Sequence, residues 1–232
     1  MPDRRPPASR DTPPLESGDH LSAREFLRRY EAMSEVKKAE LINGIVYMGS
    51  PVRIDQHGEP DGLIQGWLCN YSVATPGVKH ATNSTTRLGP DDVPQPDGLL
   101  RIAAESGGQA RVDAKGYLNG APELVVEVAA SSVSLDVREK LVSYRRSGVR
   151  DYVVWRTEDR AVDWWVLEDD EYRPLPAEAD ETLRSRVFPG LWLDVRALLA
   201  SDGRKVMAKL QEGLQSAEHA AFAAEMPKRW KT

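Results

Sequence analysis

A glutamate lies within an apolar run of strand length, in the order Leu124-Val125-Val126-Glu127-Val128. Such a valine-rich run is typical of a central strand that is covered on both faces of its sheet. A buried carboxylate there is costly, because desolvation disfavours the charged form unless a cation or hydrogen-bond donors compensate. Glu127 therefore predicts partners from elsewhere in the chain. The alternative is an edge strand with one face in water.

The segment after this run predicts a crossover to a parallel neighbour. Apolar residues recur at helical spacing through 134–147, and Gly148 ends that helix. The ranges 151–156 and 161–167 then predict two further strands. A strand, a crossover helix and a strand in this order favour a right-handed unit with parallel neighbouring strands. The fold class is therefore α/β (α+β), with a mixed central sheet flanked by helices.

Further helices and strands are expected on both sides of this unit. Ser22-Ala23-Arg24-Glu25 has the form of a capping box at the start of a helix. Asn43-Gly44 predicts a hairpin turn shortly after Glu40. The other expected elements are helices over 61–73 and 195–200 and strands over 78–88, 95–102 and 186–188.

The composition of the chain divides it into three parts. Residues 1–18 hold five prolines and almost no large apolar side chains, which predicts a disordered leader. Residues 19–200 carry the strand and helix pattern and predict the main domain. Residues 201–232 are rich in alanine, and they predict an amphipathic helical tail that packs against the domain or a second subunit.

Charge and cysteine content limit the kinds of function. The formal net charge is −5 and the isoelectric point is near 5.5, unlike a protein that binds a polyanion over its whole surface. Cys69 is the single cysteine, so neither an intramolecular disulfide nor a multi-cysteine zinc site is expected. The N-terminal residues lack the apolar core of a signal peptide, and no stretch approaches the roughly 20 apolar residues of a membrane helix. We therefore expect a cytoplasmic protein without a membrane partner.

A second acid and a lysine accompany Glu127. Asp97 lies in Pro96-Asp97-Gly98 on the strand expected before Glu127, and Lys140 lies on the helix expected after it. Two carboxylates from adjacent strands suit Mg²⁺, which prefers oxygen ligands. Such a metal lowers the pKa of a bound water and stabilises charge on a phosphoryl oxygen. Lys140 would orient or help deprotonate the attacking water, and Glu40 would add a ligand directly or through water.

Each of these residues also has an ordinary structural interpretation. Pro96-Asp97-Gly98 alone is a common turn sequence. Lys140 follows Glu139, which suits a solvated helix face, and Glu40 suits a surface acid at the end of a helix. The metal site requires residues that are far apart in the sequence to converge.

Several motifs follow one another in order between residues 20 and 200. They are Glu40-Leu41-Ile42-Asn43-Gly44, His57-Gly58, Pro96-Asp97, Pro122-Glu123-Leu124-Val125-Val126-Glu127-Val128, Ser131, Asp136, Lys140, Tyr144 and Gly148-Val149-Arg150-Asp151-Tyr152. This series resembles the Uma-two family of restriction endonucleases, which belongs to the PD-(D/E)XK nuclease superfamily. The resemblance implies a restriction-endonuclease-like core and hydrolysis of DNA phosphodiester bonds with Mg²⁺ or Mn²⁺.

The resemblance also implies a role for individual residues. Asp97 matches the Pro-Asp acid of the superfamily, and Glu127 matches its second acid. The superfamily lysine normally follows that acid by two positions, where this chain has Ala129, and Lys140 matches a lysine that the family carries on the next helix. Glu40 matches an early acid of the family. The implied catalytic set is Glu40, Asp97, Glu127 and Lys140, with the three acids as metal ligands.

The remaining expectations concern substrate and partners. His57 falls where the family often has a histidine, which implies a contact with substrate; a surface or helix-capping histidine is the alternative. Double-strand cleavage with one active site per chain favours a homodimer. The leading hypothesis is thus a metal-dependent DNA endonuclease. The acidic charge, Ala129 and the tail favour a second hypothesis, a catalytically inactive nuclease fold that binds partners or oligomerises. A hydrolase of another phosphate ester is the third.

Overall fold

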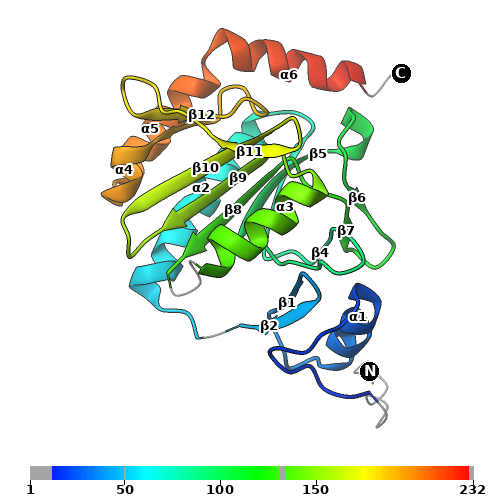
Figure 1. Ribbon diagram of the computed structural model, residues 1–232. Helices are drawn as coiled ribbons and strands as arrows, with labels where there is room; N and C mark the ends of the chain where they lie inside the picture. Colours follow the sequence, from blue (N-terminus) through cyan, green and yellow to red (C-terminus); the bar gives the residue numbers. More distant parts are fainter. Residues whose placement is uncertain (1–11, 50, 131–133, 230–232) are drawn as a thin grey trace, which may run out of the picture.

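The computed structural model describes residues 12–49, 51–130 and 134–229, and its centre is a six-stranded sheet (Figure 1). The strands lie in the order β11-β10-β9-β8-β5-β3. β8 and β9 are parallel, and the other neighbours in this sheet are antiparallel. The predicted mixed sheet is therefore confirmed. The strand bounds are Val78–Thr82 for β3, Gly98–Ile102 for β5, Leu124–Ala129 for β8, Asp151–Arg156 for β9, Ala161–Glu168 for β10 and Glu171–Pro174 for β11.

The predicted helical crossover joins β8 to β9, and it consists of a π-helical segment followed by an α-helix. Residues Leu135–Lys140 form a π-helical segment, η3, and Leu141–Ser147 continue it as α3. Gly148 ends α3 with a φ of 85°, a left-handed conformation that glycine adopts without strain. π-helical turns are rare in general but frequent at functional sites. Lys140 is the last residue of η3.

Side-chain alternation along β8 separates the two faces of the sheet. Even-numbered residues such as Val126 pack with α2 (Glu59–Ala74), whereas odd-numbered ones such as Ala129 pack with Tyr144 of α3. Figure 1 shows α2 and α3 on opposite faces. Glu127 is odd-numbered, so its side chain lies on the face of the sheet that packs with α3. Because β8 lies between β5 and β9, the interpretation of Glu127 as an edge-strand residue is wrong.

A glycine at the start of β5 lets α2 approach the sheet closely. A Cβ atom on Gly98 would lie 2.7 Å from Leu68 Cδ1 and 3.1 Å from the side-chain amide of Gln65. Gly98 pairs with Val126 of β8, so α2 packs directly over the strand ends that carry the two predicted acids. A larger residue here would require the ends of the Leu68 and Gln65 side chains to shift.

An N-terminal unit lies beside one end of the sheet, at the bottom of Figure 1. It consists of α1 (Ala23–Ala32) and a hairpin of β1 (Ala39–Ile42) and β2 (Ile45–Met48), which confirms the predicted helix and hairpin turn. Ser22 Oγ accepts the N–H of Glu25 at 3.4 Å, as a capping box predicts. The Glu25 carboxylate instead pairs with arginines of the same helix.

The packed chain begins before residue 19. Of the leader predicted over residues 1–18, residues 1–11 lie outside the described residues. Leu15 is buried in the apolar cluster of the N-terminal unit, and the N–H of Gly18 donates to the Val46 carbonyl at 2.8 Å. Residues 12–18 therefore pack on the hairpin, which the proline content of the leader did not indicate.

Two expected strands differ from the structure. The range 186–188 is a turn, because Ser185 Oγ accepts two backbone N–H groups in this range at 3.2 and 2.9 Å. The strand expected over 78–88 ends at Thr82, and the chain then enters a separate three-stranded sheet. Asn83 makes this break with a φ of 45°, a conformation that asparagine tolerates better than most residues.

The C-terminal helices complete the core on the α2 face. α5 (Gly203–Leu214) places apolar residues such as Leu210 in the same core as α2. The expected helix over 195–200 is present as α4. None of the helices in the described ranges combines the length and apolar character that crossing a membrane requires. The remaining elements are η1 (Ile54–Gly58), β4 (Thr86–Arg87), η2 (Ala104–Ser106), β6 (Arg111–Val112), β7 (Leu118–Asn119), β12 (Thr182–Arg184), β13 (Trp192–Asp194), α4 (Val195–Leu199) and α6 (Ala217–Arg229).

Candidate active site

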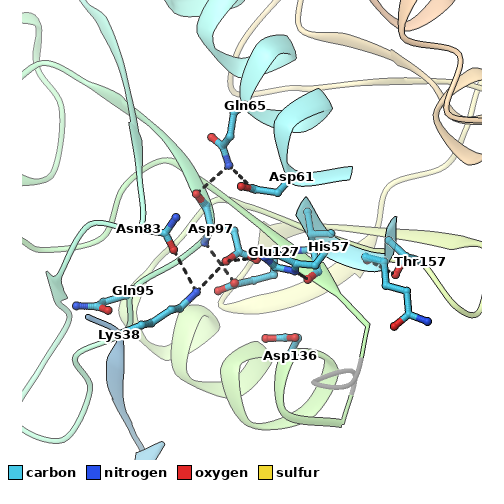
Figure 2. Close-up of polar contacts among 12 residues, drawn as sticks. Lys38, His57, Asp61, Gln65, Asn83, Gln95, Asp97, Glu127, Asp136 and Thr157 are labelled. Atoms are coloured by element: carbon cyan, nitrogen blue, oxygen red, sulfur yellow. Dashed lines mark hydrogen bonds and ion pairs between the residues drawn. The ribbon is translucent and has the colours of Figure 1, made fainter. Parts of the chain in front are cut away.

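A pocket of about 530 Å³ opens where the hairpin, η1, the start of β5, the end of β8 and η3 meet. Every residue that the sequence analysis placed in the catalytic set lines it, and so does His57. Figure 2 shows several of these side chains converging on the ends of β5 and β8. The buried ionisable side chains that line the pocket are Glu40, Asp97, Glu127, Asp136 and Lys140, and the partly exposed Lys38 lies beside Asp97.

Asp97 and Glu127 lie next to each other on neighbouring strands. The antiparallel pairing sets Gly98 of β5 opposite Val126 of β8, which brings the preceding Asp97 beside Glu127. The N–H of Asp97 lies 3.4 Å from Glu127 Oε2, and the N–H of Val128 donates to Asp97 Oδ2 at 2.9 Å. Both carboxylates are buried. The sheet register therefore holds the two acids together.

The N-terminal hairpin delivers Glu40 to the same pocket. Leu41 exchanges backbone hydrogen bonds with Val93 at 3.1 and 2.7 Å, which fixes β1 against the segment before β5. Glu40 Oε1 accepts the N–H of Gln95 at 2.8 Å and lies 3.1 Å from Lys140 Nζ. Glu40 is buried, so its interpretation as a surface acid is wrong.

Lys140 is enclosed by three carboxylates. Its Nζ atom lies 3.0 Å from Glu127 Oε1, 3.1 Å from Glu40 Oε1 and 3.3 Å from Asp136 Oδ1. Burial alone would lower the pKa of this lysine, but the carboxylates outweigh burial, and the pKa of Lys140 lies well above its ordinary value. Lys140 is therefore a buried cation rather than a solvated helix lysine.

The two acids of the strands differ in their affinity for a proton. Burial raises the pKa of Glu127 to about 8, although Lys140 opposes the rise and Tyr144 donates its hydroxyl to Oε1 at 2.8 Å. Burial would also raise the pKa of Asp97, but Lys38 and Lys140 prevail and lower it. Near neutral pH the proton of this acid pair therefore resides on Glu127.

Lys38 is a pocket residue that the sequence analysis missed. Its Nζ atom lies 2.8 Å from Asp97 Oδ1 and 3.2 Å from Asn83 Oδ1 (Figure 2). Burial would lower the pKa of Lys38, but the carboxylates of Asp97, Glu127 and Glu40 prevail and raise it. A signal was present in the sequence, because residues two apart in an extended segment share a face, and Lys38 precedes Glu40 by two.

His57 enters the pocket from η1. Its Nδ1 atom lies 2.8 Å from the Val128 carbonyl oxygen. A carbonyl only accepts, so Nδ1 carries a proton and donates it in this hydrogen bond. Nε2 lies 3.8 Å from Asp97 Oδ1, beyond hydrogen-bond distance. This arrangement directs Nε2 to the pocket side.

A hydrogen-bond network from α2 holds the backbone of Asp97 in place. Gln65 Nε2 donates to the Asp97 carbonyl at 2.9 Å and to Asp61 Oδ1 at 2.6 Å, while Gln65 Oε1 accepts from His80 Nε2 at 2.7 Å. Burial raises the pKa of Asp61 and lowers that of His80. The network ties the backbone at the start of β5 to α2.

Ala129 lies in the core and not in the pocket. Its side chain is fully buried and packs in the apolar cluster that includes Tyr144. The position where the superfamily normally has its lysine therefore holds an alanine that packs in the core. The buried ammonium comes instead from Lys140 on the crossover.

The oxygen donors of the pocket suit a hard divalent cation in chemical type. Asp97 and Glu127 place carboxylates side by side, and Mg²⁺ usually takes one or two protein carboxylates together with waters. Within the described residues, no group of three histidine, cysteine, aspartate or glutamate side chains is arranged to hold a metal. A cation at Asp97 and Glu127 would therefore keep water ligands.

Known proteins resemble this chain both in sequence and in fold. Residues 23–196 match the family described as "Uma2: Putative restriction endonuclease". The fold is similar to that in "Crystal structure of a putative nuclease belonging to DUF820 from Anabaena variabilis ATCC 29413", with a TM-score of 0.55 and 14% identity over 82% of this chain and 99% of that one. No curated protein sequence matches. The chain belongs to the Uma2 family.

Proposed function

We propose that this pocket is the active site of a metal-dependent endonuclease that hydrolyses DNA phosphodiester bonds with Mg²⁺ or Mn²⁺. The observation that carries the proposal is the convergence of Glu40, Asp97, Glu127 and Lys140 in one pocket from a hairpin, two strands and a crossover helix. Family membership supports the same reaction class. The geometry adds the charge distribution that such a reaction needs.

The formal charge of the pocket favours a divalent cation. Four buried carboxylates and two ammonium groups line its inner part, which leaves a charge of 2− when every group is ionised. Without a cation, part of this charge is removed by the proton on Glu127, whose pKa burial raises to about 8. One divalent cation would neutralise the same excess and release that proton.

The proposed metal ligands are Asp97 and Glu127, with Glu40 as a ligand directly or through water. A bound Mg²⁺ or Mn²⁺ supplies Lewis acidity to a phosphoryl oxygen and lowers the pKa of a bound water. The chain holds the two strand acids in register and excludes bulk water from their inner oxygens. His57 Nε2, which faces the pocket, is assigned a contact with the DNA.

Lys140 acts as a positioning residue in this proposal. The three carboxylates around it raise its pKa, so it does not deprotonate water near neutral pH. It instead holds Glu40, Glu127 and Asp136 within 3.3 Å of one ammonium group. This replaces the role of proton acceptor that the sequence alone allowed.

The partner we propose is DNA, and the assembly is a homodimer. One pocket contacts one strand at a time, so cleavage of both strands in one event needs two pockets related by symmetry. Sedimentation measurements on the full chain with and without duplex DNA test this part. A monomer under both conditions would contradict it.

The experiment combines cleavage with matched variants. The full chain is incubated with plasmid DNA in Mg²⁺, Mn²⁺ or a chelator, beside Asp97→Asn, Glu127→Gln and the surface control Glu171→Gln. We expect metal-dependent cleavage that falls at least about 100-fold in the two pocket variants and is unchanged in the control, because removing an essential electrostatic group typically costs that much. Absence of cleavage by the unaltered chain, or equal cleavage by Asp97→Asn, would overturn the proposal.

A specific observation favours a second candidate, an inactive nuclease fold that binds or oligomerises. Lys140 already compensates three of the acids, and no three-residue metal group lies within the described residues. Calorimetric titration with Mn²⁺ separates the two. Binding by the unaltered chain that is lost in Glu127→Gln supports the nuclease, whereas equal heats for both proteins support the inactive fold.

A further inference from the structure

The two lysines of the pocket differ in what their ammonium groups can still bind. An ammonium group has three N–H donors and no acceptor. Lys140 lies within 3.3 Å of three carboxylates, and its side chain is 4% exposed. The three carboxylates therefore enclose its ammonium group, and Lys140 is closed off from a substrate.

Lys38 has a donor left. In the part of the chain that the structure describes, its Nζ contacts Asp97 Oδ1 at 2.8 Å and Asn83 Oδ1 at 3.2 Å. Two partners leave one N–H uncommitted. The Lys38 side chain is 34% exposed, so this donor is within reach of a molecule that enters the pocket.

The path of the Lys38 side chain is fixed by its neighbours. A Cβ atom on Gly49 would lie 3.3 Å from Lys38 Cβ and 3.8 Å from its Cγ, so the glycine leaves room for the aliphatic stem. The Gly49 N–H donates to the Lys38 carbonyl at 3.2 Å. In Figure 2 the ammonium end points to Asp97, with Asn83 beside it. The donor is thus held beside a proposed metal ligand.

Resting on the proposed function, we propose that Lys38 is a catalytic residue whose ammonium donates a hydrogen bond to a non-bridging oxygen of the phosphate that is hydrolysed. In that reaction the water oxygen forms a bond to phosphorus and gives up one proton to solvent. The bond from phosphorus to the leaving sugar oxygen breaks with its electron pair, and that oxygen takes a proton from solvent. Lys38 keeps its own proton. It stabilises the negative charge that builds on the phosphoryl group.

A purely structural role for Lys38, neutralising Asp97, predicts a different pattern. In that case replacing Lys38 changes stability and metal affinity but not the number of ion pairs made with DNA. A direct phosphate contact instead releases about one counterion, so its loss lowers the slope of log binding constant against log salt by roughly 0.9. The salt slope therefore separates the two roles without depending on cleavage.

The test uses the full chain with Lys38→Met, Lys38→Arg and the adjacent exposed control Lys37→Met. We expect cleavage to fall at least about 100-fold in Lys38→Met, with partial recovery in Lys38→Arg and no change in Lys37→Met. Binding of a 20-base-pair duplex at several salt concentrations should show the smaller slope in Lys38→Met alone. A salt slope of Lys38→Met equal to that of the unaltered chain would overturn the inference, whether or not cleavage falls.

Labelling of the unaltered chain gives a readout that does not depend on any variant. Reductive methylation followed by mass spectrometry should modify Lys38 in the free protein and not in the duplex complex, while Lys140 stays unmodified in both. Equal modification of Lys38 with and without duplex would overturn the contact. If the unaltered chain does not cleave, the nuclease proposal fails, and slope and labelling still decide whether Lys38 touches a phosphate.

Discussion

Two parallel neighbouring strands each carry a buried carboxylate, at opposite ends. Glu127 lies near the end of β8, whereas Asp151 begins β9, paired with Leu124 at the start of β8. Glu127 is 2% exposed and Asp151 is fully buried. Burial raises the pKa of both, to about 8 for Glu127 and about 7 for Asp151. By burial and pKa alone the two acids look alike.

Their surroundings separate them. Glu127 faces an ammonium group, a tyrosine hydroxyl and a pocket of about 530 Å³. Asp151 accepts a hydrogen bond from the Ser185 hydroxyl at 2.5 Å, Trp164 also lowers its pKa against the effect of burial, and Asp151 does not line that pocket. A buried acid is therefore a functional candidate when a cation and an opening accompany it, and a structural feature when they do not.

Removing the cation from the Glu127 site should have the largest effect on stability. Lys140→Met leaves three buried carboxylates without their shared partner, and breaking a buried ion pair in this way costs about 3–5 kcal/mol. Urea unfolding at pH 8 measures the loss. At pH 5 the loss should be smaller, because Glu127, whose pKa burial raises, holds a proton there. The control is Lys205→Met, which removes an ion pair whose lysine is 73% exposed and should cost at most about 1 kcal/mol. A loss below about 1 kcal/mol in Lys140→Met would show that the acids need no cation.

The Asp151 carboxylate should instead affect how the stability of the fold depends on pH. Its pKa is about 7 when folded against an ordinary value of 3.8, so the folded state binds more protons and stability falls as pH rises. Between pH 5 and pH 8 this fall is on the order of 2–3 kcal/mol.

In Asp151→Asn the contribution of this group to the pH dependence should disappear. Urea unfolding of the unaltered chain and the variant at both pH values gives the difference. The exposed turn residue Asp169→Asn serves as the control and should unfold with the pH dependence of the unaltered chain. An unchanged pH dependence in Asp151→Asn would show that the acid titrates normally in the fold.

The central sheet and the burial of Glu127 could be predicted because both leave a local pattern in the sequence. A valine-rich run with one glutamate marks a central strand, and a helix ended by glycine marks a crossover. The order of the expected strands indicated Asp97 and Glu127 as a metal site with Glu40 as a further ligand, and the family resemblance named the same residues, but neither could show that they converge. The roles of these residues stay predictions.

Three features were missed for a different reason. They are the burial of Asp151, the π-helical segments and the position of Lys38 in the pocket. Asp151 stands at the start of its strand, where an acid is unremarkable, and its burial depends on Ser185, 34 residues away. The spacing of Lys38 from Glu40 indicates a shared face, but Lys38 precedes β1 in a charged segment typical of a solvated surface, and its partner Asp97 is 59 residues away. Side-chain partners that arise from tertiary packing leave no period in the sequence. The turn over 186–188 was read as a strand because Ser185 competes for its backbone N–H groups.

Removing one hydroxyl donor from each acid is a matched test of what the donors do. Tyr144→Phe takes the donor from Glu127, and Ser185→Ala takes it from Asp151. We expect each change to cost about 1–2 kcal/mol, because a buried acceptor loses its donor. Only Tyr144→Phe should weaken Mn²⁺ binding, measured by calorimetry, because only Glu127 is a proposed ligand. Equal weakening in both variants would mean that the loss reflects general destabilisation.

The smallest effect on stability is expected at Glu40. Glu40→Gln keeps an oxygen that accepts the Gln95 N–H, and two carboxylates remain around Lys140, so the free energy of unfolding should change by less than about 1 kcal/mol. Mn²⁺ affinity should nevertheless fall, by about tenfold if Glu40 binds the metal through a water. The exposed Glu35→Gln is the control. An unchanged affinity in Glu40→Gln would leave Glu40 as an anchor for Lys140 alone, and the metal ligands of the chain would then be the two strand acids.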